Sequence, residues 1–559
     1  MPLRDVDSYN KRLTMLTTEK SSLMEYWRDL ADTHLAHRGK FLNGTSSKKG
    51  HKRNTKQPNN TSRLAARTLA SGMMAGITSP ARPWFRLATS DPILTEIEEV
   101  RLWLNDCEVI MREVFSSSNL YNSLHMLYSE LGVFGTASMG VYEDFENVIW
   151  CKPYTIGSYS LATNGRNEVD TQYREYQYTV AQTVDEFGLD NCSTRIKEMW
   201  KKGNTEALIN IVHIIEPNTD RDNISPLAKH KRFRSVYYEK STSRQESKQF
   251  LRESGFDEFP ILAPRWDVSG EDVYASDCPG MTAIGDAKSL QLAERRGAQA
   301  VDKVVTPPMQ APSSLRNKLS QSSLVSGAIT FVEDTSAGGV KSMYDFRPDI
   351  NAMEARIDKY ENRIQRTFYE DLFLMLANSD RRQITAREIS ERHEEKLLML
   401  GPVLERLHNE LLDPLIDITF AILQRKGILP VPPEVIRDTN LKVEYVSVLA
   451  QAQRMVAVTA IERTAAFAGE LSAIWPEARH KFNAQQAVDE FSSAMGVSPR
   501  IINSDDDVEE IEAVEAQAAM EAQQAEQMAQ TVDVASQASQ MPTDQETVLT
   551  DVMKAAGLQ

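Results

Sequence analysis

The sequence predicts an α+β protein that is predominantly helical. Over most of the 559 residues, apolar side chains recur every three or four positions, which is the period of an amphipathic helix. The period changes to two between residues 137 and 263, as in strands with one buried face. Two long helical stretches enclose a short segment of mixed pattern at 306–348. A chain of this length exceeds the size of one hydrophobic core, so several packed units are expected.

The first part of the chain is predicted to be two helices joined by a basic loop. Residues 3–38 carry an apolar stripe without internal proline. Residues 39–60 are rich in Lys, Asn, Ser and Gly, which predicts a flexible loop, either a solvated linker or a contact with nucleic acid. Residues 61–87 begin as a helix of small side chains, which Pro80 and Pro83 end. Close backbone approach, between subunits, is predicted at its small residues Ala70, Gly72, Ala75 and Gly76.

Two more helices precede the region of alternating pattern. They are predicted at 93–115 and 120–131 from apolar residues at helical spacing. In the alternating region, an Asn-Gly pair at 164–165 predicts a type I′ hairpin between strands at 158–161 and 169–178. This region is therefore expected to be mixed α and β.

Further strands and a row of tyrosines continue this region. The strands are expected at 208–215, 233–239 and 259–263. Tyr173, Tyr176 and Tyr178 are expected to cover a sheet, and stacking on nucleic-acid bases is the alternative.

The two long helical stretches are predicted at 281–305 and 349–376. At the rise of an α-helix each is roughly 40 Å long, so the two can lie side by side. Pro307-Pro308 ends the first, and the insert at 306–348 contains strand-like runs near 328–332 and 340–344. The stripe of the second helix predicts a packing surface, again between subunits, that includes Ile357, Tyr360, Ile364 and Phe368.

A polar segment at 377–384 separates these helices from another one. Thr385 and Glu388 have the spacing of a capping box, which predicts a new helix from 385 to 427. Gly401-Pro402 and Pro414 predict that this helix is kinked. The intervening segment is too polar to be buried, and by itself it has the composition of an ordinary exposed turn. Its central residues are Asn378, Ser379, Asp380, Arg381, Arg382 and Gln383.

Charge is concentrated at the C-terminal end. The formal net charge is −16, and residues 505–559 contain thirteen acidic residues and one lysine, a net of −12, which leaves −4 for the preceding 504 residues. Residues 447–500 are predicted to be helical and rich in Ala, whereas 505–559 is predicted to be disordered or a thin peripheral helix. A nearly neutral body lacks the clustered Lys and Arg of a protein that grips DNA tightly.

Several classes of protein are disfavoured by what the sequence lacks. No run of eighteen apolar residues and no charged-then-apolar leader is present, so neither a membrane contact nor secretion is expected, and the predicted location is the cytoplasm. No phosphate-binding loop, dinucleotide fingerprint, zinc-protease motif or nucleophile elbow occurs. We therefore expect no catalytic residues, no metal and no cofactor. Four cysteines without C-x-x-C spacing are expected to be packed thiols: Cys107, Cys151, Cys192 and Cys278.

Four blocks of the sequence resemble the head-to-tail connector, or portal, proteins of short-tailed bacteriophages. The blocks are LASGMMAGITSPARPWFRL (69–87), RWDVSGEDVYASDCPGMTAIGDAKSLQ (265–291), DKVVTPPM (302–309) and TAREISERHEEKLLMLGPVLERLHNELLDPLID (385–417). The resemblance spans roughly residues 5–450 and keeps the order of the blocks, whereas the far C-terminus resembles nothing comparable.

The resemblance implies a ring, usually of twelve subunits, at one vertex of the virion capsid, assembled in the host cytoplasm. Double-stranded DNA would pass through the ring without tight binding, and the partners would be terminase, tail adaptor proteins and the major capsid or scaffolding protein. The implied regions are a wing (1–280), a first stem helix (281–305), a clip (306–348), a second stem helix (349–376), a tunnel loop facing DNA (377–384), a kinked wing helix and connector (385–439), a helical crown (440–504) and an acidic tail (505–559). A head-tail adaptor, usually much smaller, and a phage DNA-processing enzyme are the alternatives.

Overall fold

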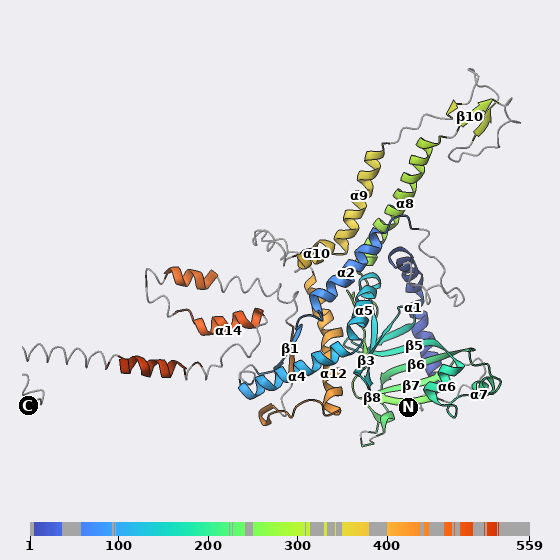
Figure 1. The fold of residues 1–559 in the computed structure, drawn as a ribbon. Coiled ribbons are helices and arrows are strands. Elements are labelled where there is room, and N and C mark those ends of the chain that lie inside the picture. The colour runs from blue at the N-terminus through green and yellow to red at the C-terminus, as the bar shows by residue number, and fades with distance from the viewer. Residues whose placement is uncertain are drawn as a thin grey trace, which may run out of the picture.

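The computed structural model is an α+β body from which two long helices project (Figure 1). The structure describes residues 5–35, 57–91, 97–222, 227–240, 250–307, 309–312, 329–332, 341–342, 349–378, 400–436, 441–445, 463–471, 481–495 and 511–522, with isolated positions at 94, 224–225, 475, 508 and 524. In these residues the expected α+β class is confirmed.

Four helices form the helical part of the body. They are α1 (Val6–His34), α2 (Thr61–Ile77), α4 (Glu98–Ser117) and α5 (Leu120–Phe134). The Asp5 side chain caps α1 by accepting a hydrogen bond from the Ser8 N–H, at 2.9 Å. Gly135 ends α5 with φ of +75°, the left-handed conformation that glycine adopts without a side-chain clash. The helices predicted in this half of the chain are thus confirmed, with shifts of a few residues at their ends.

A five-stranded antiparallel sheet occupies the other side of the body, in the order β4-β5-β6-β7-β8. Helix α1 covers one face, and α6 (Val180–Phe187) and α7 (Thr194–Lys201) cover the other. The buried Tyr173 and Tyr176 lie on these opposite faces, so the prediction that the tyrosines cover a sheet is confirmed for both. The strands are β4 (Tyr159–Thr163), β5 (Val169–Thr179), β6 (Leu208–Pro217), β7 (Phe233–Glu239) and β8 (Phe250–Phe256).

The predicted hairpin between β4 and β5 exists, but its turn differs from the predicted one. The loop has five residues, 164–168, and it is the non-glycine Asn167 that has a positive φ, of 61°. The Asn164 side chain accepts hydrogen bonds from the N–H groups of Arg166 and Glu168, at 2.8 and 3.1 Å. Together with the backbone hydrogen bond from the Asn164 N–H to the Glu168 carbonyl oxygen, at 2.9 Å, this side chain closes a five-residue loop in place of a two-residue type I′ turn.

A smaller sheet connects this region to the helices. It contains β2 (Ser138–Asp144), β3 (Val148–Tyr154) and β9 (Ile261–Leu262), in the order β3-β2-β9. Its buried side chains belong to the same main core as α2, α4, α5 and α8 (Pro279–Val305). The short 3-10 helices are Ala228–His230 and Glu434–Ile436.

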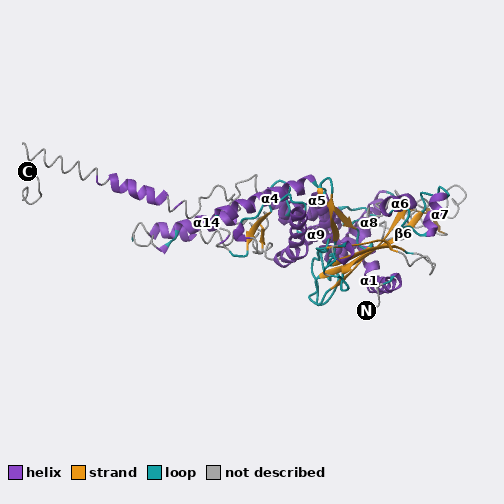
Figure 2. Cartoon of the chain, turned by 90° about the horizontal axis from the view of Figure 1, so that it is seen from below, coloured by secondary structure: helices purple, strands orange, loops and turns teal. Residues whose placement is uncertain are grey.

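The segment expected to begin the helical crown contains a strand. β13 (Leu441–Tyr445) pairs antiparallel with β1 (Phe85–Thr89), which the sequence pattern also missed. Behind β1, the carboxylate of Glu108 accepts a hydrogen bond from the Leu87 N–H at 2.9 Å, and burial raises the Glu108 pKa to about 7. Helices do occur at 463–471 and in α14 (Ala484–Met495), and residues 511–522 form an exposed helix. Figure 2 shows α14 on one side of the body and α6 and α7 on the other.

The projecting helices are α8 (Pro279–Val305) and α9 (Ile350–Thr367), and a small sheet lies at their far end (Figure 1). That sheet has the order β11-β10-β12 and includes a strand that was not predicted, β10 (Met309–Pro312), beside β11 (Ile329–Val332) and β12 (Lys341–Ser342). The helix expected to run from 349 through 376 is broken, because Tyr369 has a positive φ of 55°. A second helix, α10 (Glu370–Asn378), follows the break.

The predicted kinked helix lies along the body from residue 400 to Arg425. Residues 400–407 are α-helical, His408–Leu412 form a π-helical turn, and α12 (Asp413–Arg425) continues the helix. The irregular turn lies directly before Pro414 and not at Gly401-Pro402. The expected capping box at Thr385 lies outside the described residues. The four cysteines are free and buried, which confirms that they are packed thiols.

Gly72 is the point of closest contact between α2 and α10. A Cβ atom at this position would overlap the ring of Phe373, which is itself buried. We expect Gly72→Ala to destabilise the protein by about 1–3 kcal/mol, because the added methyl group would overlap both the ring and the Cβ of the buried Phe373, which would have to shift as a whole. Thermal unfolding measures the effect.

A matched control is Gly285→Ala in α8, where no atom lies within 4 Å of the added methyl group. In a helix interior, alanine is more favourable than glycine by up to about 1 kcal/mol. The melting temperature of this variant should therefore stay constant or rise. Equal melting temperatures for the two variants would contradict the close packing of α2 on α10.

Candidate functional site

The two-helix projection is anchored where α8, α9 and the start of α2 meet. The side-chain amide of Asn59 donates hydrogen bonds to Glu294 of α8 at 2.8 Å and to Glu361 of α9 at 2.7 Å. Farther toward the body, Arg363 of α9 forms an ion pair with Asp286 of α8, at 3.1 Å. These polar contacts fix the position of α8 relative to α9. Asn59, which precedes α2, makes two of them.

At this anchor and beyond it, α8 exposes apolar side chains. Val301 is 43% exposed, Val304 45% and Val305 73%, and Leu292 is 47% exposed. Ile357 and Tyr360 on α9 are half-buried. Apolar side chains clustered on a projection are typical of a surface that contacts another chain.

The charges on the projection nearly cancel on each helix, with four basic and three acidic residues on both, a net of +1 each. On α8 they are Lys288, Arg295, Arg296, Lys303, Asp286, Glu294 and Asp302, and on α9 they are Arg356, Lys359, Arg363, Arg366, Glu354, Asp358 and Glu361. No continuous row of cations is available to hold phosphates along the described part of the projection.

The residues predicted to pack between subunits fall into two groups. Ala70, Gly76, Ile364 and Phe368 are buried within the single chain, so their packing is intramolecular, which corrects the prediction for these positions. Gly72 also packs inside the chain, against Phe373. Ala75 is exposed, and Ile357 and Tyr360 are half-buried. These three side chains therefore have accessible surface that is available for contact with a neighbouring subunit. The periodic pattern identified apolar faces but could not tell which partner each face has.

Most of the predicted tunnel loop lies outside the described residues. Asn378 belongs to α10 and not to the loop, which corrects its assignment, and Ser379, Asp380, Arg381, Arg382 and Gln383 are not described. In the described part of the chain, no group of three or more His, Cys, Asp or Glu side chains is arranged to hold a metal ion. None of the described helices combines the length and hydrophobicity that a bilayer crossing requires.

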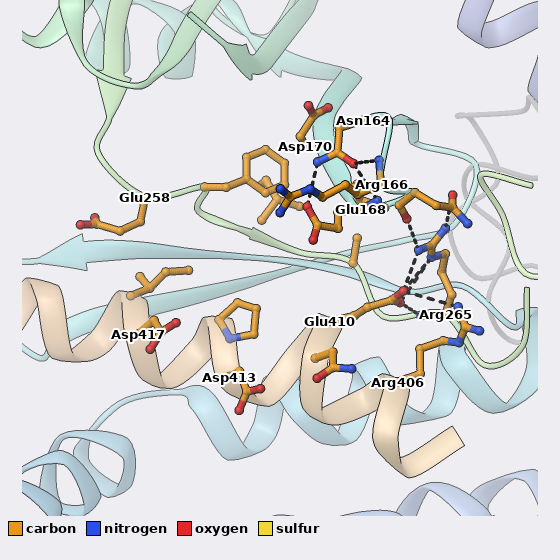
Figure 3. A pocket seen from close by; sticks show the side chains of 18 of the residues that line it. Asn164, Arg166, Glu168, Asp170, Glu258, Arg265, Arg406, Glu410, Asp413 and Asp417 are labelled. Carbon is orange, nitrogen blue, oxygen red and sulfur yellow. Dashed lines mark hydrogen bonds and ion pairs between the residues drawn. The ribbon is translucent and has the colours of Figure 1, made fainter. Parts of the chain in front are cut away.

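A groove of about 1240 Å³ lies between the helix at 400–425, the β4–β5 loop and the segment that leads from β9 toward α8 (Figure 3). One wall carries Glu405, Asp413 and Asp417 of that helix. Burial raises the pKa of Asp417, and the neighbouring Asp413 raises it further. The whole lining contains seven carboxylates and four arginines, so the groove has a net negative charge, which does not favour phosphate.

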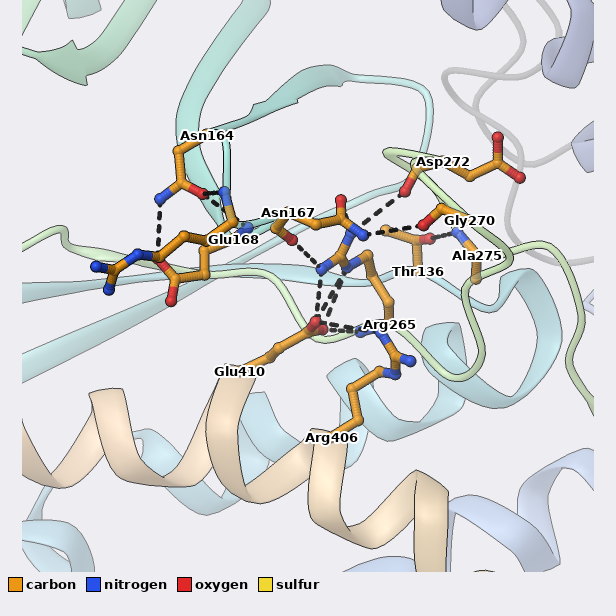
Figure 4. A network of polar contacts seen from close by, with 11 residues as sticks. Thr136, Asn164, Asn167, Glu168, Arg265, Gly270, Asp272, Ala275, Arg406 and Glu410 are labelled. Carbon is orange, nitrogen blue, oxygen red and sulfur yellow. Dashed lines mark hydrogen bonds and ion pairs between the residues drawn. The ribbon is translucent and has the colours of Figure 1, made fainter.

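At one end of the groove Arg265 and Glu410 form a buried ion pair (Figure 4). The Arg265 side chain is 2% exposed, and its Nη2 donates to Glu410 Oε1 at 2.6 Å. Its Nε lies 3.1 and 3.3 Å from the two carboxylate oxygens, and Nη2 also donates to the Asn167 carbonyl oxygen at 2.7 Å. Both residues lie within blocks of the sequence that show the family resemblance, but no spacing rule could have indicated that they pair.

His34 joins α1, α2 and α8 at the start of the projection. Its Nε2 is 3.0 Å from the carbonyl oxygen of Gly280, and its Nδ1 contacts the Ser62 hydroxyl. Burial lowers the His34 pKa to about 4, so the imidazole is neutral at pH 7. A neutral ring donates one hydrogen bond and accepts the other, as these two partners require.

This pKa predicts a pH dependence. Between pH 6.5 and about 4 the unfolded chain binds a proton at His34 that the folded chain excludes, so stability falls as the pH is lowered through this range. His34→Gln removes this titration. The stability advantage of the parent protein over His34→Gln should therefore shrink by up to about 3 kcal/mol between pH 7 and pH 4. A constant difference across this range in chemical denaturation would contradict a neutral, buried imidazole.

A mixed α+β body with exposed apolar side chains on a helical projection is typical of a subunit that associates with other chains. The chain belongs to the family of bacteriophage head to tail connecting proteins, whose model matches residues 6–502. It is 45% identical over 548 residues to the portal protein of Salmonella phage epsilon15, and the similarity covers 98% of both chains. It is 42% identical over 492 residues to the probable portal protein of Bordetella phage BPP-1, which covers 88% of this chain and 87% of that protein. The resemblance found in the sequence is thus confirmed.

Proposed function

We propose that the chain is the portal subunit of a bacteriophage, which forms a ring at one capsid vertex and conducts the genome during packaging and ejection. The observation that carries this proposal is the similarity to phage portal proteins over nearly the whole chain. The role is structural, and the chain itself performs no catalysis.

The described architecture supports a division into functional regions. The body before Pro279 would be the wing, α8 and α9 the stem, and the small sheet at their far end the clip. The clip, as the end farthest from the body, is the part that would meet terminase during packaging and tail adaptor proteins afterwards. The wing would face the major capsid or scaffolding protein, and residues 440–504 would form the crown. The ring would be a homododecamer assembled in the host cytoplasm.

The charge distribution suits a conduit for DNA. Tight contacts between Lys or Arg and successive phosphates would retard a sliding duplex, because each contact must break before the next one forms. Both stem helices have a net charge of only +1, and the acidic C-terminal segment repels phosphate. DNA would therefore pass the stem without being held.

Ring formation is the direct test, and the exposed valines of α8 provide a specific variant. Replacing Val301 and Val304 together by Ser should leave the subunit folded, because both side chains are largely exposed in one chain. Each subunit would lose apolar contact area with its neighbour, so fewer rings should form. Electron microscopy of the purified protein measures the ring yield, and thermal unfolding of the subunit measures its integrity.

The matched control is Gln299→Ser, an exposed polar position on the same helix. It should leave ring formation unchanged. Parent protein that remains monomeric under all salt conditions would overturn the portal assignment. Normal rings in the valine variant would overturn only the role of this surface.

We also propose that residues 379–383 belong to the loop that faces DNA in the channel. Replacing Arg381 and Arg382 by Ala should leave ring assembly intact and impair packaging or retention of DNA, because two cations in a loop that faces DNA would contact phosphates transiently. Ser379→Ala is the control and should package normally. Failure of the arginine variant to form rings, or unimpaired packaging by it, would reject the loop assignment.

A further inference from the structure

A row of cationic and aromatic side chains crosses the five-stranded sheet, on the face that packs against α6 and α7. Each member lies directly opposite the next one on the neighbouring strand, and the row consists of Arg174, His213, Tyr237 and Arg252. His213 stacks on Tyr237, with ring centroids 3.9 Å apart. Burial, and then the nearby cations, lower the His213 pKa well below its usual value, so the imidazole is neutral at pH 7. The positive charge of the row therefore belongs to the two arginines at its ends.

Lys152, on β3 of the smaller sheet, adds a third cation beside this row. The Cζ atom of Arg174 lies 4.6 Å from the ring centroid of Tyr154 and 4.4 Å from that of Tyr176. Tyr154 is two positions after Lys152 on β3, so both side chains point to the same face of that strand. Burial, and then the positive charge of Arg174, lower the pKa of Lys152 to about 8. The ammonium group is therefore destabilised in its present surroundings.

Arg174 and Lys152 have no counter-ion in the part of the chain that the structure describes. Neither side chain forms an ion pair with a described carboxylate, and the Arg174 Nε is buried without a hydrogen-bond partner among the same residues. Glu186 of α6 offsets part of the charge at Lys152, but it is ion-paired with Arg252 at 2.9 Å. A desolvated charge without a partner is costly, so this site is incomplete in the isolated subunit.

Accessible aromatic side chains lie on the same hairpin and strand as the two cations. Trp150 is 44% exposed, and the Lys152 ammonium lies 5.4 Å from its ring centroid. Phe145, in the turn between β2 and β3, is fully exposed. Tyr178 is half-buried, and its ring packs edge-on against that of Tyr176, with centroids 4.7 Å apart. Tryptophan, tyrosine and arginine are enriched in protein interfaces, so this composition indicates contact with a protein chain.

The chemistry of the site favours a carboxylate as the missing group. A carboxylate is planar and accepts two parallel hydrogen bonds from the edge of a guanidinium that stacks on aromatic rings. A phosphate dianion would bring more negative charge toward the neighbouring Glu186. A DNA duplex is held by several exposed cations in succession, whereas Arg174 and Lys152 are both half-buried.

The carboxylate would come from another chain. The acidic C-terminal segment of this chain follows α14, which lies on the opposite side of the body from α6 and α7 (Figure 2). We propose that Arg174 and Lys152, beside Trp150, bind an Asp or Glu carboxylate in an acidic segment of a partner protein. The bound carboxylate supplies the counter-ion that the subunit lacks, and the aromatic side chains bury the contact. The site belongs to the folded subunit and does not depend on conduction of DNA.

The first variant is Lys152→Gln, tested with a fluorescently labelled hexaglutamate peptide at low ionic strength. Fluorescence anisotropy should show binding to the parent protein and at least about tenfold weaker binding to the variant, because one of the two cations is gone. The melting temperature should stay constant or rise, since the removed ammonium group has no counter-ion in the subunit. A lysine that only supports the fold would instead lower the melting temperature when it is replaced.

Two further variants separate this site from general charge effects. Arg174→Lys keeps the charge but removes the planar pair of donors, so hexaglutamate should again bind about tenfold more weakly. Lys202→Gln is the matched control, because it removes an exposed lysine at the end of α7. Its peptide binding and its melting temperature should both match those of the parent protein. Inorganic phosphate should displace the peptide no further than sodium chloride of equal ionic strength does.

Three results would overturn the proposal. The first is no measurable binding of hexaglutamate by the parent protein, or equally strong binding by Lys152→Gln. The second is displacement of the peptide by inorganic phosphate beyond the effect of sodium chloride, which would assign the site to phosphate groups.

The third result concerns Glu246, in the segment 241–249 between β7 and β8. A loss of melting temperature in Glu246→Gln that is absent in the Lys152→Gln background would mean that this chain supplies its own carboxylate. All these measurements use the purified full-length protein without capsid or DNA, so none of them depends on whether the portal assignment is correct.

Discussion

The first turn of α8 lies against the backbone of α5, and a side chain at Gly280 would collide with it. A Cβ atom there would lie 2.5 Å from the carbonyl oxygen of Val133 and 2.7 Å from its Cα. The Cys278 thiol donates to the same carbonyl at 3.3 Å, and the Nε2–H of His34 donates to the carbonyl oxygen of Gly280 at 3.0 Å. These contacts fix the direction of α8 over its first turn, and a small error in that direction would grow along the whole length of the projection.

Buried polar groups determine how the separate parts of the body fit together. Lys20 of α1 donates to the carbonyl oxygens of Gly157 and Tyr159, at 3.1 and 2.8 Å, and burial lowers its pKa to about 8. Apolar packing alone would tolerate small displacements of α1 along the sheet. A buried ammonium group with two fixed acceptors does not, because displacement would leave it unsatisfied. His34 and Arg265 fix α8 and the wing helix in the same way.

The sequence allowed prediction of those elements whose cause is local. Helices α1, α5 and α8 follow from apolar spacing and from caps within a few residues of their ends. The pairing of β1 with β13 has no local cause, since the two strands lie far apart in the sequence and neither is favoured until the other is present. The break at Tyr369 was missed because no glycine or proline marks it, although its ring lies near Trp266, with centroids 6.4 Å apart. Tertiary packing around Phe368 and Leu372, both fully buried, determines where the helix bends.

The same distinction between local and tertiary causes applies to the residues of α9 that were predicted to pack between subunits. The apolar stripe of α9 was correctly identified, but Ile364 and Phe368 are completely buried in the subunit, whereas Ile357 and Tyr360 keep exposed surface. The periodic pattern identifies which side of the helix is apolar. Only the folded structure shows which part of that apolar side is buried against the body. Arg265 and Glu410 lie far apart in sequence, so their pairing became evident only in the folded chain.

The outer half of the stem buries too little to be stable by itself. Beyond Leu290 the only residue of α8 buried in the described structure is Ala300, and the only one of α9 is Ile364. Isolated helices of this length are marginal in water, and most helical stability in proteins comes from packing of the apolar face. Contacts from outside the subunit at the exposed valines of α8 would therefore stabilise the two projecting helices further. In the proposed ring, neighbouring stems would supply those contacts, so assembly and the rigidity of the channel wall would arise from the same apolar surface.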